Sequence, residues 1–189
     1  MTRTCLLRST LAAALIVAGG SARAEVQKFW SSCGGQRLCV SYQLALTPPP
    51  DWTFDAKASA ENQVQIIVPQ GKNFANAEAL IYVQVFYHPD KKQSLADFAR
   101  ASNARWLAAE RRAKISDLPA VERANGKPAF LRFAYENPGK PQQAYEVGAF
   151  GLDSDKDGNE FVLDIVLTGS AKTALDRAEN DYVAFLKTH

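Results

Sequence analysis

The chain has 189 residues, of which 47% are hydrophobic and 22% are charged, so it suits one globular domain and excludes a disordered chain. The formal net charge is +2, and acids and bases are interspersed, which leaves no basic field for nucleic acid or anionic lipid. Two histidines and one methionine leave little material for metal or nucleophile chemistry.

Residues 1–24 have the pattern of a secretory signal peptide. Arg3 and Arg8 precede an apolar run at 11–17, and Ala22-Arg23-Ala24 fits the small-x-small rule for cleavage. The apolar run is shorter than the roughly 20 residues of a membrane span, and an uncleaved anchor is the alternative. Cleavage would export the chain to the periplasm without a transmembrane segment and leave 19 basic and 20 acidic residues, a net charge of −1.

Residues 25–47 are predicted as a disulfide-closed hairpin and strand. The two cysteines that remain after cleavage are Cys33 and Cys39, and an oxidising compartment favours a disulfide between them. A redox-active pair is the alternative, which the Cys-x5-Cys spacing disfavours because such pairs use Cys-x-x-Cys. Strict alternation from Leu38 to Leu46 predicts a half-buried strand, which ends at Pro48-Pro49-Pro50.

Residues 48–189 are predicted as one α+β domain. Alternation of apolar residues predicts strands at 64–68, 79–87, 129–135, 144–152 and 161–168, with another from Ile115 onward. Helical spacing predicts helices at 94–113, with Ser94 as N-cap, and at 170–187, capped by Gly169-Ser170. The buried stripe of the second helix is predicted as Ala174, Leu175, Ala178, Tyr182, Phe185 and Leu186. Short turns make the late strands antiparallel, and strands apolar on both sides imply a sheet sandwiched by helices.

An acidic segment, Asp153-Ser154-Asp155-Lys156-Asp157-Gly158, matches the start of a calcium loop. Asp164 falls at the twelfth position of that loop, where the usual ligand is the longer Glu. Glu160 occupies a position where an apolar residue normally packs. Calcium binding by Asp153, Asp155, Asp157 and Asp164 is therefore an alternative interpretation.

A tight hairpin is the preferred interpretation of the same segment. With Asp157-Gly158 at the centre of a two-residue turn, Leu152 faces Leu163, and Phe150 faces Ile165. This register gathers the large apolar side chains on one face. It places Asp164 opposite Gly151, on the other face, where a buried acid needs partners.

Motifs of known enzyme chemistry are absent from the sequence: there is no Gly-x-Ser-x-Gly elbow, His-Glu-x-x-His helix or P-loop. His88 lies at the end of a predicted strand, where a solvent-facing or hydrogen-bonded role is usual. We therefore expect no enzyme, no catalytic residues and no cofactor. A hydrolase with an unrecognised carboxylate site is an alternative.

The chain resembles the PsbP-like family of small exported α/β/α proteins over residues 48–187. The residues that carry the resemblance are Pro50-Asp51-Trp52, Pro69-Gln70-Gly71, the strand 79–87, Ser94-Leu95-x-x-Phe98, Gly126-Lys127-Pro128-Ala129 and the closing helix with Tyr182. The resemblance implies a central antiparallel sheet between helices and no active site. Members act as accessory subunits, as envelope proteins and as immunity proteins against periplasmic toxins, and they share no binding motif.

The expected function is thus an exported, non-catalytic protein-binding module of the bacterial envelope. An immunity-type inhibitor and an accessory protein are its concrete forms, and the partner is another protein rather than nucleic acid. The sequence does not identify the binding residues. Exposed loops at 70–76, 137–142 and 154–159 are the places to look.

Overall fold

A computed structural model describes residues 26–32, 38–88, 93–109, 112–124, 126–140 and 144–189. The predicted signal peptide lies outside the described residues. Within these residues twelve elements follow one another, in the order β1 (Val26–Ser32), β2 (Leu38–Leu44), β3 (Trp52–Phe54), α1 (Ala56–Asn62), β4 (Gln65–Pro69), β5 (Ala79–Tyr87), α2 (Leu95–Ala109), β6 (Lys114–Val121), β7 (Phe130–Glu136), β8 (Tyr145–Ser154), β9 (Glu160–Gly169) and α3 (Lys172–Thr188).

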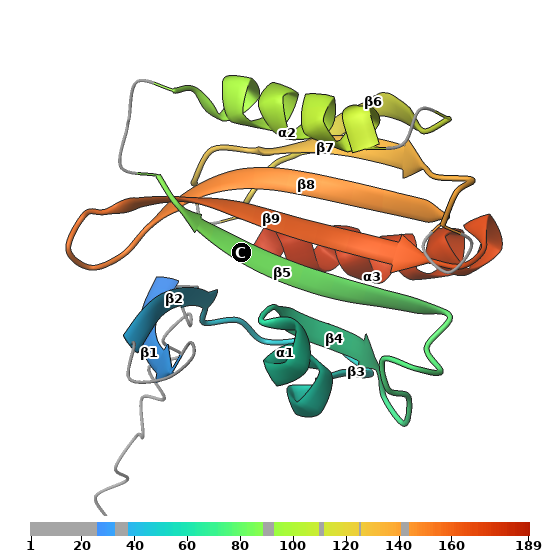
Figure 1. The fold of residues 1–189 in the computed structure, drawn as a ribbon, viewed down its shortest axis with the longest axis horizontal. Helices are drawn as coiled ribbons and strands as arrows, with labels where there is room; N and C mark the ends of the chain where they lie inside the picture. Colours follow the sequence, from blue (N-terminus) through green and yellow to red (C-terminus); the bar gives the residue numbers. More distant parts are fainter. Residues whose placement is uncertain (1–25, 33–37, 89–92, 110–111, 125, 141–143) are drawn as a thin grey trace, which may run out of the picture.

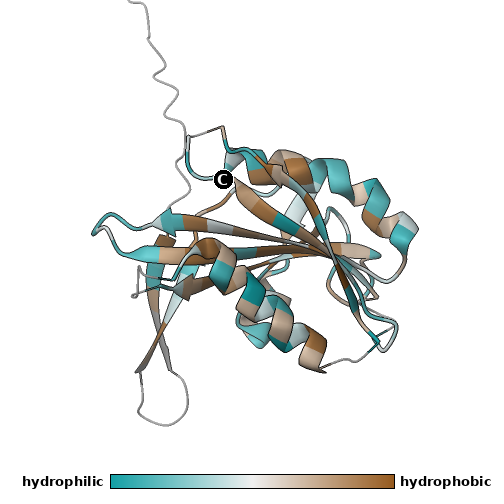
Figure 2. Cartoon of the chain, turned by 90° about the horizontal axis from the view of Figure 1, so that it is seen from above, coloured by the Kyte–Doolittle hydropathy of each residue, from teal (hydrophilic) through white to brown (hydrophobic). Residues whose placement is uncertain are grey.

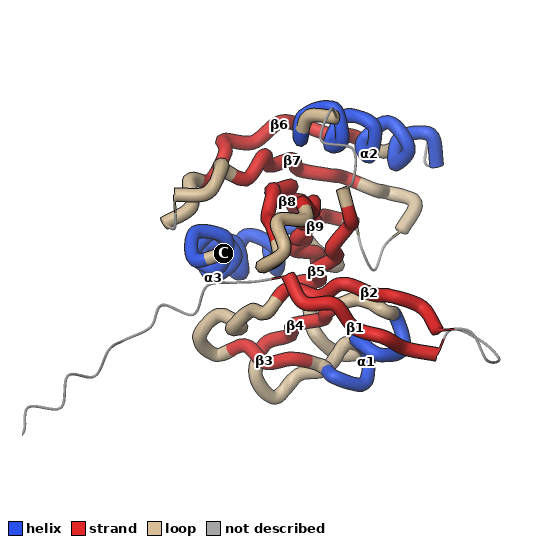
Figure 3. Tube along the Cα trace, turned by 90° about the vertical axis from the view of Figure 1, so that its left-hand side faces the viewer, coloured by secondary structure: helices blue, strands red, loops and turns tan. Residues whose placement is uncertain are grey.

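The central feature is an antiparallel sheet of seven strands, in the order β3-β4-β5-β9-β8-β7-β6 (Figure 1). The strand β9 lies in the middle and is buried along most of its length, because its residues are apolar on both faces. Figure 3 shows α3 on one side of this sheet and α1 and α2 on the other. The predicted α+β class, with helices on both faces, is confirmed.

The face under α3 holds the main core. The predicted stripe of α3 is confirmed residue by residue as its buried side. It packs on alternate residues of the central strands, among them Ile81, Leu163, Ile165 and Leu167. The hydroxyl of Tyr182 is fully buried and donates a hydrogen bond of 2.7 Å to the backbone oxygen of Ile165. Each large apolar side chain buried here contributes about 1.5–3 kcal/mol relative to exposure.

The opposite face is covered at its two ends by separate helices. Ala58 of α1 packs with Ile66 and Val68 of β4, while Ala99 of α2 packs with Phe150 and Val162. Figure 2 shows the brown, hydrophobic segments gathered in the sheet, with the helices alternating between teal and brown. The N-cap role predicted for Ser94 is confirmed, since its hydroxyl accepts a hydrogen bond of 3.1 Å from the Asp97 amide.

The register predicted for the β8–β9 hairpin is wrong by one residue. Leu152 faces Val162 rather than Leu163, and Phe150 faces Asp164 rather than Ile165. The turn contains three residues, because the Gly158 amide bonds to the Asp155 carbonyl at 3.1 Å and Gly158 adopts a φ of 79°. Since both faces of the two strands are apolar, the hydrophobic pattern alone did not distinguish the two registers.

Three smaller predictions also differ from the structure. The helix predicted to 113 ends at Ala109 as α2, and Lys114 already begins β6. The last helix begins at Lys172 with Ala171 as its N-cap and no side-chain cap, so Gly169-Ser170 does not cap it. The short elements β3 and α1 were not predicted, because three and seven residues are too few for a periodic pattern.

The hairpin of β1 and β2 forms its own two-stranded sheet and packs on the main body. Val26 and Leu44 belong to the main core, and the ring of Tyr42 stacks on that of Tyr87 with centroids 5.8 Å apart. Cys33 lies outside the described residues, so its disulfide with Cys39 stays a prediction; Cys39 itself is not a free thiol. None of the described helices has both the length and the hydropathy required to traverse a lipid bilayer.

Candidate functional site

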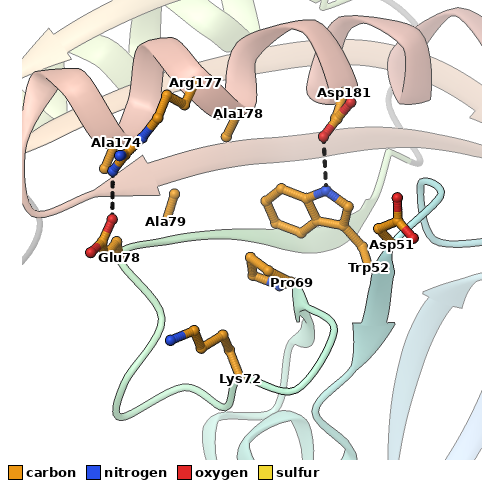
Figure 4. A pocket seen from close by; sticks show the side chains of 10 residues that line it. All are labelled: Asp51, Trp52, Pro69, Lys72, Glu78, Ala79, Ala174, Arg177, Ala178 and Asp181. Carbon is orange, nitrogen blue, oxygen red and sulfur yellow. Dashed lines mark hydrogen bonds and ion pairs between the residues drawn. The ribbon is translucent and has the colours of Figure 1, made fainter.

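A pocket of about 390 Å³ lies between the first half of α3 and the adjoining ends of β3, β4 and β5 (Figure 4). Its floor contains small side chains from two elements, Ala79 on β5 and Ala174 and Ala178 on α3, which leave room where larger residues would fill it. The remaining lining residues are Asp51, Trp52, Pro69, Lys72, Glu78, Arg177 and Asp181.

The indole of Trp52 forms one wall of the pocket. Its Nε1–H donates a hydrogen bond of 3.1 Å to Oδ2 of Asp181, which joins β3 to α3 across 129 residues of sequence. The preceding residue, Asp51, has a φ of 62°, a left-handed conformation that Asp tolerates better than most residues. The Gln70 amide donates to the Asp51 carbonyl at 2.7 Å, so the turn before β3 is fastened to the end of β4. This turn directs the indole towards α3.

The other end of the pocket carries an exposed ion pair. Nη2 of Arg177 lies 2.5 Å from Oε2 of Glu78, and both side chains are 70% exposed. Such a surface pair contributes little to stability, about 0–1 kcal/mol. Lys72 extends into the same end from the loop after β4 (Figure 4). Asp51 and Lys72 make no side-chain hydrogen bond or ion pair with another described residue.

A second pocket of about 210 Å³ lies at the other end of the sheet. It is lined by Arg112, Lys114, Glu136, Asn137, Pro138, Ala144 and Tyr145. It includes Asn137 and Pro138 of the predicted loop 137–142, of which residues 141 and 142 fall outside the described part of the chain. Among the described residues that line it, the half-buried Tyr145 is the aromatic one.

The structure does not bring the four predicted calcium ligands together. Asp153 is buried and engaged by cations of the protein, since Nζ of Lys127 lies 2.6 and 2.7 Å from its two oxygens and Nη2 of Arg123 lies 3.2 Å from Oδ2. Asp155 lies in the turn, where the side-chain amide of Asn159 and nearby backbone amides lower its pKa. Asp157 is exposed at the tip.

Asp164 lies far along β9, opposite Phe150, on the face that α1 and α2 cover. Asp153, by contrast, neighbours Phe161, whose side chain belongs to the core under α3. Within the described residues, no group of three or more His, Cys, Asp or Glu side chains is placed to hold a metal ion.

Two carboxyl groups on the α2 side of the sheet have shifted pKa values. Burial, followed by the charge of Glu146, raises the pKa of Asp164 to about 7. Burial also raises the pKa of Glu146. Within the described residues Oδ1 of Asp164 has no hydrogen-bond partner. In the sequence, Asp164 stands out as the single ionisable group of its strand, whereas Glu146 does not, because a charged residue near the start of a predicted strand is usually solvated.

His88 is buried and hydrogen-bonds through Nδ1 to Oε1 of Glu160 at 2.8 Å. This is the hydrogen-bonded role expected for it. The other ring nitrogen, Nε2, has no partner in the described part of the chain, so no hydroxyl or thiol there is positioned by His88 as a nucleophile. The imidazole ring is nearly perpendicular to the ring of Phe98, with centroids 6.4 Å apart.

Comparisons with known proteins add no assignment, because no protein-family model matches the chain and no curated protein matches its sequence. The pocket beside Trp52 is therefore judged on its own geometry. In the sequence, Asp51, Trp52 and Pro69 are signals of the fold, and the loop that contains Lys72 is a candidate place for binding. The sequence could not show that these residues meet α3.

Proposed function

We propose that this protein is an exported, non-catalytic protein-binding module of the bacterial envelope, either an immunity-type inhibitor or an accessory protein. The observation that carries the proposal is a pair of exposed aromatic side chains at an edge of the sheet. Phe54 on β3 is 39% exposed and Phe74 in the loop after β4 is 42% exposed. The strand β3 pairs with β4 alone and ends the sheet on that side.

Asp55, the residue after Phe54, fastens the backbone of the loop that carries Phe74. Its Oδ2 accepts a hydrogen bond of 2.9 Å from the Phe74 amide. Its Oδ1 accepts from the Ala58 amide at 3.0 Å, which caps α1 and fixes the loop on a rigid element. A partner that covers Phe54 and Phe74 would remove apolar surface from water, which is favourable.

Trp52 extends this surface into the pocket, because it stands two residues before Phe54 on the same strand and so points to the same face. Aromatic residues are enriched in protein interfaces, where they supply large contact areas at low entropic cost. A sheet edge with aromatic side chains and an adjoining pocket therefore supports binding of another protein. We call Trp52, Phe54 and Phe74 the β3-edge surface.

The test is capture of a partner by the full chain, expressed with an affinity tag in its source organism. Phe54→Asp and Phe74→Asp should abolish a stoichiometric partner that the parent protein retains. Leu107→Asp is the matched control, because Leu107 is 41% exposed on α2, away from β3. A partner retained equally by all variants, or turnover of a substrate with no partner, contradicts the proposal.

The kinship with the PsbP-like family, the export and the Cys33–Cys39 disulfide belong to the same proposal. The helix-covered antiparallel sheet is compatible with that family but does not by itself assign it. A hydrolase remains the second candidate, since His88 with Glu160 forms half of a proton-transfer relay. Hydrolysis would require a nucleophile or a water molecule at Nε2 of His88. Loss of hydrolytic activity in a Glu160→Gln variant would favour this second candidate.

A further inference from the structure

We infer that the pocket beside Trp52 receives a basic side chain, Lys or Arg, of the partner protein. The inference rests on the proposed function and names the chemistry by which that partner is held. It follows from the separation of charge along the pocket, the fixed orientation of the indole and the size of the cavity. These three observations are independent of the exposed phenylalanines.

Charge is distributed unevenly among the ten lining residues. Figure 4 shows the carboxylates of Asp51 and Asp181 at the Trp52 end, while Lys72 and the Arg177–Glu78 pair lie at the other end. Arg177 is neutralised by Glu78 at 2.5 Å. Among the described lining residues, the Trp52 end therefore carries two negative charges and no cation, which attracts a positively charged group.

The indole adds a second attraction for a cation. The hydrogen bond to Asp181 fixes the edge of the ring, so the ring is held upright between β3 and α3 without reorganisation on binding. Trp is the best aromatic partner for an ammonium or guanidinium group, and one such contact contributes about 0.5–2 kcal/mol. Because Asp181 uses only Oδ2 for the indole, Oδ1 stays available as an acceptor.

The donors of a basic side chain match the acceptors at this end. Asp51 makes no side-chain hydrogen bond with a described residue, so both of its oxygens can accept. A guanidinium carries five N–H donors in a planar fork, which suits carboxylate acceptors beside an aromatic ring. The cavity of about 390 Å³ is at the small end for ligand sites and holds one long side chain with its aliphatic stem on Ala79 and Ala178.

The experiment uses the full chain, labelled with ¹⁵N, and N-acetyl-arginine methylamide as the probe. The indole N–H signals are followed by NMR, and the Trp52 signal is assigned by its loss in Trp52→Phe. We expect a saturable shift of that signal with a Kd of about 1–10 mM, weakened by salt. N-acetyl-citrulline methylamide, which has the same shape but no charge, should cause no shift.

Two isosteric variants test the carboxylates. Asp51→Asn retains a residue that tolerates a left-handed φ, and Asp181→Asn retains an oxygen for the indole N–H, so both should fold. Each variant should raise the Kd of the arginine probe about 3- to 10-fold. Asp157→Asn at the exposed hairpin tip is the matched control. A shift that is equal for citrulline, or unchanged in both variants, overturns the inference.

Failure of this inference is distinguishable from failure of the proposed function. The arginine probe requires no partner. If the probe binds but no protein is captured, the cation site is supported and the protein-binding function is refuted. If capture of a partner depends on Phe54 and Phe74 but the probe does not shift the Trp52 signal, the protein-binding function is supported and the cation site is refuted.

Discussion

Arg123 and Asp153 form an ion pair shielded from water, with Nη2 3.2 Å from Oδ2 and side chains that are 0% and 1% exposed. Arg123 also donates to the backbone oxygens of Leu152, at 2.7 Å, and of His189. Its guanidinium carbon lies 4.7 Å from the centre of the Phe130 ring. The pair thus links the loop after β6 to the end of β8 and to the residue after α3.

Removal of Asp153 should destabilise the fold strongly. Asp153→Asn leaves the buried charge of Arg123 without its counterion, which costs about 3–5 kcal/mol. Chemical denaturation followed by circular dichroism measures the change. Asp157→Asn should stay within about 0.5 kcal/mol, because that side chain is exposed. Equal effects of the two variants would show that the pair contributes nothing.

Calcium should leave the thermal stability unchanged. Asp153 is neutralised by Lys127 and Arg123, and Asp164 lies on the other face, so the sites of the predicted loop cannot converge on one ion. Differential scanning calorimetry at millimolar calcium checks this. An increase in Tm that disappears in Asp155→Asn would restore the calcium interpretation.

Asp164 should make stability depend on pH. Its pKa is raised to about 7 in the folded chain, so the folded state holds its proton more tightly than the unfolded state. Stability is therefore full below about pH 4, the unfolded pKa, and falls as the pH rises towards 7, by at most about 4 kcal/mol. Glu146 adds to the loss in the same direction, since burial raises its pKa.

Asp164→Asn removes this titration. We expect the variant to be more stable than the parent at pH 8 and nearly equal to it at pH 4. Urea denaturation at four pH values between these limits gives the comparison. A constant difference at every pH would mean that Asp164 does not titrate between the two states.

Gly151→Ala should destabilise the sheet by about 1–3 kcal/mol. A Cβ at Gly151 would overlap with Cδ1 and Cε1 of Phe130, whose ring is fully buried. Phe130→Leu frees space at that point, so the double variant should cost less than the sum of the two single variants. Strict additivity in thermal unfolding would contradict the contact.

Mass spectrometry can detect the predicted disulfide. A Cys33–Cys39 bond makes the protein about 2 Da lighter than its reduced form, and a proteolytic map should place both cysteines in one linked peptide. Reduction should lower stability by roughly 2 kcal/mol, the value for closing a short loop. The same map locates the amino terminus, which should be Glu25 if residues 1–24 are cleaved. Two alkylated cysteines without reduction would exclude the bond.

Elements with an unbroken periodic pattern were predictable from the sequence. The strand predicted at 79–87 is β5 residue for residue, and the stripe of α3 is its buried side. The register of the β8–β9 hairpin was not predictable from the sequence, because both strands bury residues on both faces. A shift of one residue in the pairing therefore exchanges one apolar set for another. Three-residue β3 carries no period at all.

The candidate pocket depends on contacts that sequence patterns do not contain. Trp52 meets Asp181 across 129 residues, and Glu78 meets Arg177 across 99. Each of these side chains is ordinary for its position: an aromatic residue on a strand, or a charge on an exposed helix face or in a loop. Only the packing of α3 against the start of β5 brings them to one cavity, and the alanines that make space look like common helix and strand residues.

The side-chain amide of Gln65 has a consequence for mechanical behaviour. Its oxygen accepts from the Leu44 amide at 2.9 Å and its nitrogen donates to the Leu44 carbonyl at 2.8 Å, so one side chain substitutes for a neighbouring strand. These two bonds attach the β1–β2 hairpin to β4 in addition to the apolar packing of Val26 and Leu44. Glutamate at this position would remove the donor and repel the Leu44 carbonyl, so we expect the hairpin to be attached less firmly to β4.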